Sequence, residues 1–248
     1  MTGIRKKVLS VTAGLLGLAL TTTAPAFAFT LAVQDVLNNI TQAGQSTDSN
    51  INALTDALAD SSDSLWRLGA SGGSVSTLVI ELAGNASTNV FGIYDPVDMA
   101  QVQLFSGLDS VGFSNGGLKL LSILADGSVF VNFADTGVVF NSNLFGFYLG
   151  TQNDGTFYSD TAKNTDGVDH MAAYQGVGDT IQIPGFASGV WGNNEYILGW
   201  EDLNGGGDLD YNDFVVLVES VHPVPEPGTM LLMGSGLLGL GLWRKFKK

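Results

Sequence analysis

The sequence predicts an all-β domain, an antiparallel β-sandwich or jelly roll, with a short helical lead-in before it. From Trp66 onward, short runs of apolar, β-branched and aromatic residues recur about every ten residues, a spacing typical of such folds. Turn-forming pairs such as Asp126-Gly127 separate the runs. The run 118–124 is also compatible with a helix. The runs that we expect to form strands are 76–82, 89–94, 101–105, 118–124, 128–133, 144–149, 156–159, 170–175, 180–183, 195–200 and 214–219.

Composition changes along the chain divide it into four segments. They are a signal peptide with its N-terminal helix (1–28), a helical or loosely ordered lead-in (29–64), the β-sandwich domain (65–221) and a tail that contains a hydrophobic helix (222–248).

The first segment has the pattern of a secretory signal peptide. Arg5-Lys6-Lys7 is followed by an apolar run over 8–20 and by Ala26-Phe27-Ala28, where Ala26 and Ala28 form a small-residue cleavage site. We therefore expect export and a mature chain that begins at Phe29. A retained membrane anchor is the alternative, but the apolar run is shorter than a membrane span requires.

The lead-in has the period of a helix rather than that of a strand. Two sets of apolar residues repeat at helical spacing: Leu31, Val33, Val36, Leu37 and Ile40, then Ile51, Leu54 and Leu58. A short helical hairpin fits this pattern, with Ser49 or Asn50 as the cap of the second helix. A loosely ordered lead-in fits it as well.

The distribution of charge excludes several classes of function. The segment 29–222 contains 23 acidic residues and only three basic ones, Arg67, Lys119 and Lys163, so its net charge is −20. Nucleic-acid binding needs a basic surface and is excluded, whereas so acidic a body attracts divalent cations. Because the chain has no cysteine, disulfides, iron–sulfur clusters and thiolate zinc sites are excluded too.

The loop 201–213, between the last two expected strands, combines three consecutive glycines with clustered acidic residues. Glycine adopts positive φ without steric cost, and a hard cation such as Ca²⁺ would relieve the repulsion between neighbouring carboxylates. We therefore predict a Ca²⁺ site, although the spacing does not match an EF-hand. Alternatively, these side chains only cap backbone N–H groups in turns. The candidate ligands are Glu201, Asp202, Asn204, Asp208, Asp210 and Asp213.

A second loop, 160–170, has a similar composition. Asn164, Asp166 and Asp169 are weaker candidate ligands for a further cation. His170, at the start of an expected strand, is either a ligand or a hydrogen-bonded structural residue.

The C-terminal segment begins with prolines at alternate positions over 223–227. This pattern favours a stiff, extended linker that stays outside the sheets. The uncharged apolar run 230–243 and the basic residues 244–248 follow. The run is short for a membrane span, and the basic end would stay on the cytoplasmic side.

Two resemblances to known families follow from these motifs. Glu201-Asp202-Leu203, with the run 207–213, resembles the signature of DUF4114, a β-rich extracellular domain of uncharacterised function. The likeness extends over about 65–219. The order of Pro225-Glu226-Pro227, apolar helix and basic tail resembles the PEP-CTERM sorting signal.

The second resemblance implies a destination and partners. Proteins with this tail are associated with Gram-negative bacteria that make exopolysaccharide. The resemblance implies that an exosortase-type membrane enzyme recognises Pro225, Glu226 and Pro227 and releases the protein outward. The C-terminal helix would lie in the membrane before this processing, and the mature protein at the cell surface or in the extracellular matrix.

From these observations we predict an exported, non-enzymatic protein of the cell surface or exopolysaccharide matrix, with Ca²⁺ as a stabilising ion. One alternative is a carbohydrate-binding module that stacks sugars on Trp191, Tyr196 and Trp200. The other is an extracellular polysaccharide hydrolase. For the hydrolase, the G-x-S-x-G match at 112–116 has the context of a turn rather than of a nucleophile elbow, and among so many acidic residues no carboxylate pair stands out.

Overall fold

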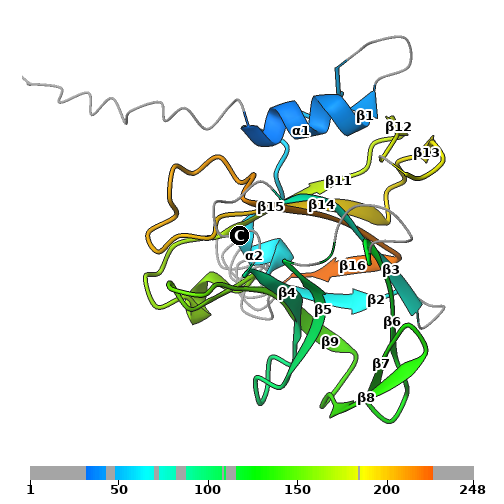
Figure 1. Ribbon diagram of the computed structural model, residues 1–248, viewed down its shortest axis with the longest axis vertical. Coiled ribbons are helices and arrows are strands. Elements are labelled where there is room, and N and C mark those ends of the chain that lie inside the picture. Colours follow the sequence, from blue (N-terminus) through cyan, green and yellow to red (C-terminus); the bar gives the residue numbers. More distant parts are fainter. Residues whose placement is uncertain are drawn as a thin grey trace, which may run out of the picture.

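The computed structural model describes residues 32–42, 48–69, 73–81, 88–107, 109, 116–183 and 185–225. In this part of the chain two large antiparallel sheets face each other, which confirms the predicted β-sandwich (Figure 1). The predicted signal peptide with Ala26 and Ala28, the apolar C-terminal run, Glu226 and Pro227 lie outside the described residues. Among the described residues, no helix is long and apolar enough to cross a membrane.

The first sheet has the spatial order β16-β2-β9-β4-β5, and β10 pairs with β9 beside this path. Its strands are β2 (Leu65–Leu68), β4 (Val90–Tyr94), β5 (Gln101–Ser106), β9 (Leu144–Gly150), β10 (Thr156–Tyr158) and β16 (Val221–Val224).

The second sheet has the order β11-β14-β15-β3-β6-β7-β8. Its strands are β3 (Gly73–Glu81), β6 (Leu118–Ile123), β7 (Ser128–Val131), β8 (Ala134–Val139), β11 (Met171–Gln175), β14 (Glu195–Trp200) and β15 (Phe214–Glu219). A small third sheet has the order β1-β12-β13. The remaining elements are β1 (Thr41–Gln42), β12 (Thr180–Ile181), β13 (Gly189–Val190), the helices α1 (Ala32–Ile40) and α2 (Asp60–Asp63) and the 3-10 turn η2 (Thr161–Lys163).

Aromatic side chains fill much of the inner core between the two large sheets. Trp66 of β2 meets Tyr196 of β14 edge to face, with ring centroids 4.9 Å apart. Phe91 of β4 stacks on Phe214 of β15 at 5.3 Å. Because such pairs contribute about 0.5–1.5 kcal/mol beyond the burial of their area, they hold the two sheets together at the centre of the sandwich.

A second core lies on the outer face of β11, β14 and β15. Along β15, Phe214 and Val216 belong to the inner core, whereas Val215 and Leu217 belong to the second core, as the period of two in a strand requires. Both faces of this strand are therefore buried. This burial explains why its sequence is continuously apolar rather than alternating.

The lead-in covers the second core (Figure 1). Its first helix forms as predicted, with Leu37 of α1 fully buried. The second helix of the expected hairpin does not form: the chain over 51–59 is irregular, and Leu54 is 54% exposed. Instead, the buried carboxylate of Asp179 accepts hydrogen bonds from the backbone N–H of Asn50 (2.8 Å) and from its side chain (2.5 Å). These bonds attach the lead-in beside β12.

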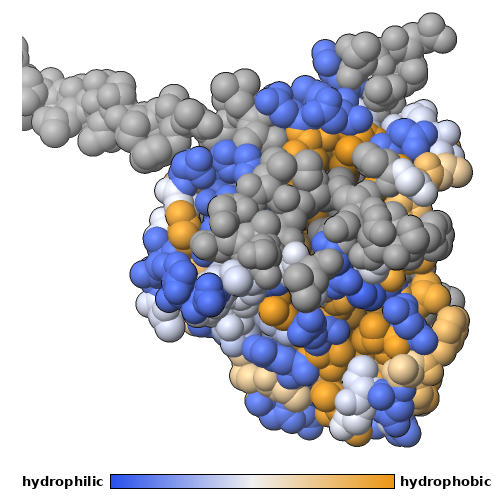
Figure 2. Space-filling view, viewed as in Figure 1, coloured by the Kyte–Doolittle hydropathy of each residue, from blue (hydrophilic) through white to orange (hydrophobic). Residues whose placement is uncertain are grey.

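The runs expected as strands form strands, with ends that differ by up to three residues, and 118–124 contains a strand rather than a helix. The strands β1, β2, β8, β13 and β16 were not expected. Just before β8, the chain reverses through Asn132 and Phe133, whose φ angles are 51° and 65°. Figure 2 shows hydrophobic surface at the end of the molecule where β7 and β8 lie. Phe133 at this turn is 83% exposed, and Val139 at the opposite end of β8 is 57% exposed.

The expectation that the proline-rich segment stays outside the sheets is wrong. Val221–Val224 forms β16, which pairs with β2. Pro223 has no N–H to donate, but β16 is an edge strand, and an edge strand needs partners along one side only. Pro225, the first residue of the predicted sorting motif, follows this strand directly and is exposed.

The second core makes the lead-in part of the folded domain, and this can be tested with Leu37→Ala. Removal of a fully buried leucine side chain should lower the free energy of unfolding by about 2–5 kcal/mol. Urea denaturation followed by tryptophan fluorescence measures this change. The matched control is Leu54→Ala, at the exposed position, which should lie within about 0.5 kcal/mol of wild type. Equal stabilities for the two variants would show that the lead-in does not pack on the sheet.

Candidate metal centre

Glu201 stands at the point where β14 ends and the acidic loop begins. In β14, Tyr196, Leu198 and Trp200 point into the inner core, and Ile197 points to the opposite face. The alternation of the strand therefore directs Glu201 away from the inner core, toward the side that the loop covers. Its side chain is fully buried there.

The loop folds back over the end of β14 and buries this carboxylate. The backbone N–H of Tyr211 donates a hydrogen bond to Glu201 Oε1 (2.5 Å). Two glycines permit this close approach: a Cβ at Gly199 would overlap the backbone oxygen of Tyr211, and a Cβ at Gly207 would lie 2.7 Å from Glu201 Oε2. Within the described residues, Glu201 Oε2 has no hydrogen-bond partner.

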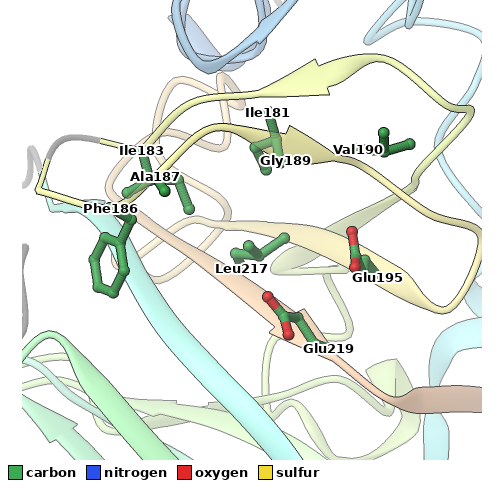
Figure 3. Close-up of a pocket in the computed structure, with 9 residues that line it drawn as sticks. All are labelled: Ile181, Ile183, Phe186, Ala187, Gly189, Val190, Glu195, Leu217 and Glu219. Carbon is green, nitrogen blue, oxygen red and sulfur yellow. The ribbon is translucent and has the colours of Figure 1, made fainter.

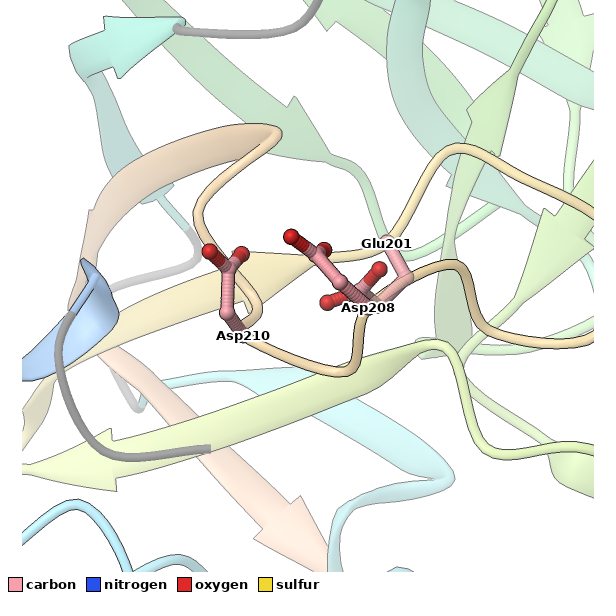
Figure 4. Close-up of side chains that lie close together, drawn as sticks. All are labelled: Glu201, Asp208 and Asp210. Atoms are coloured by element: carbon pink, nitrogen blue, oxygen red, sulfur yellow. The ribbon is translucent and has the colours of Figure 1, made fainter. Parts of the chain in front are cut away.

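Two further carboxylates, Asp208 and Asp210, join Glu201 in one cluster (Figure 4). One carboxylate oxygen from each of these residues lies within 4.8 Å of those of the other two. Asp208 is exposed and Asp210 is half-buried, so Glu201 forms the floor of the site and Asp208 its solvent side. Asp210 lies between Leu209 and Tyr211, whose positive φ angles (59° and 53°) turn the backbone on either side of it.

The electrostatics of the cluster disfavour three free negative charges. Burial, together with the charges of Asp213, Asp210 and Asp208, raises the pKa of Glu201 to about 8. Burial and the charge of Asp208 also raise the pKa of Asp210. The ion pairs that lysines form among the described residues lie elsewhere: Lys119–Asp109 and Lys163–Asp160. A cation or a proton is therefore needed to stabilise the cluster.

Three other predicted ligands of this loop lie outside the cluster. Asp202 is buried and accepts a hydrogen bond from the side chain of Asn89 (3.0 Å). Asp213 accepts one from the backbone N–H of Asp202 (3.1 Å). Asn204 is exposed at the tip of the loop, and its backbone N–H points to Asp154 (3.4 Å). The capping role that we considered as the alternative describes the contact of Asp213, and Asp210 of the cluster also accepts a hydrogen bond from the backbone N–H of Asn212 (3.3 Å).

The second acidic loop supports the first rather than forming a cluster of its own. Asp166 Oδ2 accepts a hydrogen bond from the backbone N–H of Gly205 (2.8 Å) and lies 2.9 Å from Nε2 of His170. Burial acts to raise the pKa of Asp166, but these bonds outweigh it and lower the pKa to about 2. Nδ1 of His170 lies 3.1 Å from the carbonyl oxygen of Glu201. Both ring nitrogens are thus engaged, and His170 is a structural residue.

The other two candidates of this loop also serve the backbone. The side chain of Asn164 accepts a hydrogen bond from Tyr158 N (2.7 Å) and donates to the carbonyl oxygens of Tyr158 and Val168. Asp169 accepts one from Met171 N (3.1 Å). All three candidate ligands of the second loop thus accept hydrogen bonds from the protein, and the second cation site stays a prediction.

Sequence reasoning missed a buried carboxyl group next to this loop. Asp63, the last residue of α2, is 1% exposed. Burial, followed by the charges of Asp169 and Asp60, raises the pKa of Asp63 to about 9. Asp63 lies two residues before β2, a strand that the sequence did not predict, and no sequence pattern distinguishes it from the exposed acids.

The predicted sugar-stacking surface does not form. Trp191 and Trp200 have no exposed surface and Tyr196 is 2% exposed. Tyr196 and Trp200 lie in the inner core and Trp191 in the second core, so none of these rings can stack on a sugar.

A separate pocket of about 340 Å³ lies at the other end of β14 and β15 (Figure 3). Its walls are mostly apolar and include Leu217 and Phe186. Glu195 and Glu219 are direct cross-strand partners at its rim. Burial and the charge of Glu195 raise the pKa of Glu219. No predicted site residue lines this pocket.

Two family models match the chain. Residues 137–221 match "Domain of unknown function (DUF4114)", and residues 223–245 match "PEP-CTERM protein-sorting motif". Both resemblances are thus confirmed, the first over 137–221 rather than over the whole of 65–219, and the DUF4114 match contains both acidic loops. The motif marks a protein that is exported and processed at the membrane by an exosortase-type enzyme. Neither the curated proteins nor the solved structures include a match.

The raised pKa values predict that the cation-free protein is less stable at pH 8 than at pH 5. Folded Glu201 keeps its proton to about pH 8 and folded Asp63 to about pH 9, whereas both lose it near pH 4 in the unfolded chain. Between these values the folded state binds more protons, so stability falls as the pH rises.

Thermal denaturation in EDTA between pH 5 and pH 8 measures this dependence. The melting temperature of wild type should fall with pH, and Glu201→Gln should flatten the profile. Asp135→Asn, an exposed site on β8, should leave the profile unchanged. A melting temperature that rises steadily with pH would contradict the assignment of protonated buried carboxyls.

Proposed function

We propose that this exported protein, with its DUF4114 domain and PEP-CTERM motif, is a non-enzymatic component of the cell surface or exopolysaccharide matrix whose fold is stabilised by Ca²⁺. The proposal of a bound cation rests on the cluster of Glu201, Asp208 and Asp210, in which one carboxylate oxygen from each residue lies within 4.8 Å of those of the other two. One of the three is fully buried, and its Oε2 has no hydrogen-bond partner in the described residues.

Ca²⁺ suits this cluster better than other common ions do. All the groups on offer are oxygens, which hard cations prefer, and they come from a flexible glycine-rich loop. Mg²⁺ requires a near-ideal octahedral shell, whereas Ca²⁺ accepts irregular ones. Extracellular modules bind Ca²⁺ with dissociation constants of about 10⁻⁴–10⁻³ M. At ten times such a constant, the ion would stabilise the fold by about 1.4 kcal/mol.

The proposed role at the surface or in the matrix is supported by the C-terminal sorting motif and by the negative net charge of the protein. The sorting motif implies an exosortase-type partner and a destination outside the inner membrane. The body has a net charge of −20 between 29 and 222, which keeps it soluble and leaves divalent cations as its natural electrostatic partners. An exopolysaccharide layer that holds such cations is the partner that we propose.

A non-enzymatic role is supported by the geometry of the acidic groups. Glycoside hydrolases place their two carboxyl groups about 5–5.5 Å or about 6.5–9.5 Å apart around the scissile bond. In this cluster one oxygen from each of three carboxylates lies within 4.8 Å of the other two, an arrangement that suits a shared cation rather than two carboxyl groups on either side of a sugar. His170 offers no free base, since both its ring nitrogens are engaged.

The cation site can be tested by thermal denaturation with and without Ca²⁺. Addition of 5 mM Ca²⁺, about ten times a dissociation constant in this range, should raise the melting temperature of the chelated protein by several degrees. Asp208→Asn should abolish most of this rise, because it removes one of three clustered charges at an exposed position that tolerates substitution. The charge-matched control Asp135→Asn, on the distant strand β8, should keep the full rise. The proposal fails if Ca²⁺ leaves the wild-type melting temperature unchanged.

A further inference from the structure

We infer that the bound cation also takes a pair of adjacent hydroxyl groups from a neutral sugar, which makes this loop a Ca²⁺-dependent carbohydrate-binding site. The inference rests on the proposed cation site and assigns a ligand class to it. It differs from the aromatic stacking expected from the sequence, because it uses none of the buried rings.

The coordination number of Ca²⁺ exceeds the number of carboxylates in the cluster. Ca²⁺ takes six to eight oxygens. The cluster offers three carboxylates: Glu201 at the end of β14, and Asp208 and Asp210 from the loop (Figure 4). Asp202 and Asp213 lie outside this cluster. Within it, Asp210 also accepts hydrogen bonds from the backbone N–H (3.3 Å) and the side chain (2.8 Å) of Asn212. Three bidentate carboxylates supply six oxygens, so at a coordination number of seven or eight one or two ligand positions remain for oxygens from outside the chain.

The open positions face solvent. Asp208 and Asn204 are exposed, and Leu203 is 43% exposed. At Gly205 a Cβ would meet no atom within 4 Å, so this side of the loop tip is open, although Asp166 contacts the backbone of Gly205 from another side. A ligand as large as a sugar residue can therefore reach the ion.

Charge then selects a neutral ligand. Three ionised carboxylates and one Ca²⁺ leave the occupied site with one negative charge, and the body around it is strongly acidic. A further carboxylate, as in a uronic acid polymer, would be repelled. Hydroxyl oxygens of a neutral sugar bind a hard cation without adding charge, and two adjacent hydroxyls replace two waters at once.

The loop tip also offers contacts to the sugar itself. The exposed side chain of Leu203 can cover a C–H face of the sugar, and a Cβ at Gly207 would lie 3.6 Å from Leu203 Cβ, which places this leucine beside the floor of the site. The exposed amide of Asn204 can donate to or accept from a third hydroxyl. An apolar contact and a neutral hydrogen-bonding group beside an ion suit a polyhydroxylated ligand.

The test measures binding of the exported protein to immobilised polysaccharides by biolayer interferometry, in 5 mM Ca²⁺ or in EDTA. The probes are the neutral polymers dextran and mannan, the same polymers after periodate oxidation of their adjacent hydroxyls, and carboxymethyl-dextran. We expect binding to at least one neutral polymer in Ca²⁺ and its loss in EDTA, after periodate treatment and in Asp208→Asn. Leu203→Ser should weaken sugar binding and leave the Ca²⁺-induced rise in melting temperature intact.

The outcomes separate this inference from the cation site. If Ca²⁺ raises the melting temperature but no neutral polymer binds, the sugar site is wrong and the cation site stands. If Ca²⁺ has no effect on the melting temperature, the cation site itself is wrong. Binding that survives EDTA, or that is at least as strong to carboxymethyl-dextran as to dextran, would overturn the inferred role of the ion.

Discussion

The hydrogen bond from Tyr211 N–H to the buried carboxylate of Glu201 is the contact around which the acidic loop is built. It draws the loop back over the end of β14 and leaves the second oxygen of Glu201 without a partner in the described residues. Because unpaired buried charge is costly, the loop needs either a proton on Glu201 or a cation beside it. The positions of Asp208 and Asp210 allow the cation.

The sandwich gives this loop a rigid base. β14 and β15 are buried on both faces, between the inner core and the second core under α1. The lead-in also reaches the loop directly, since the backbone N–H of Val33 in α1 donates to the carbonyl oxygen of Asp210 (3.2 Å). On the other side, the carboxylate of Asp166 accepts a hydrogen bond from the backbone N–H of Gly205 in the acidic loop. A cation in the cluster would thus connect the N-terminal helix, the end of β14 and the second acidic loop.

The sequence predicted most of the sandwich because strand periodicity and glycine-rich turns are local signals. It missed β16, since Pro223 argues against a strand unless the strand is known to lie at an edge. It named the three clustered carboxylates but could not separate them from Asp202 and Asp213, because hydrogen bonds to Asn89 and to the backbone depend on tertiary contacts. For the same reason the sequence could not show that Trp191 and Trp200 fill the cores rather than bind a ligand.

The central claim is that one cation lies among Glu201, Asp208 and Asp210, and crystallography with an anomalous scatterer tests it most directly. Crystals of the exported protein soaked in Tb³⁺, a hard cation that replaces Ca²⁺ at oxygen ligands, should show one strong anomalous peak at roughly 2.3–2.6 Å from oxygens of all three residues. Excess Ca²⁺ should displace this peak. If the map shows no peak there, or if Glu201 Oε2 is hydrogen-bonded to a water with Asp208 and Asp210 turned away, the account is wrong.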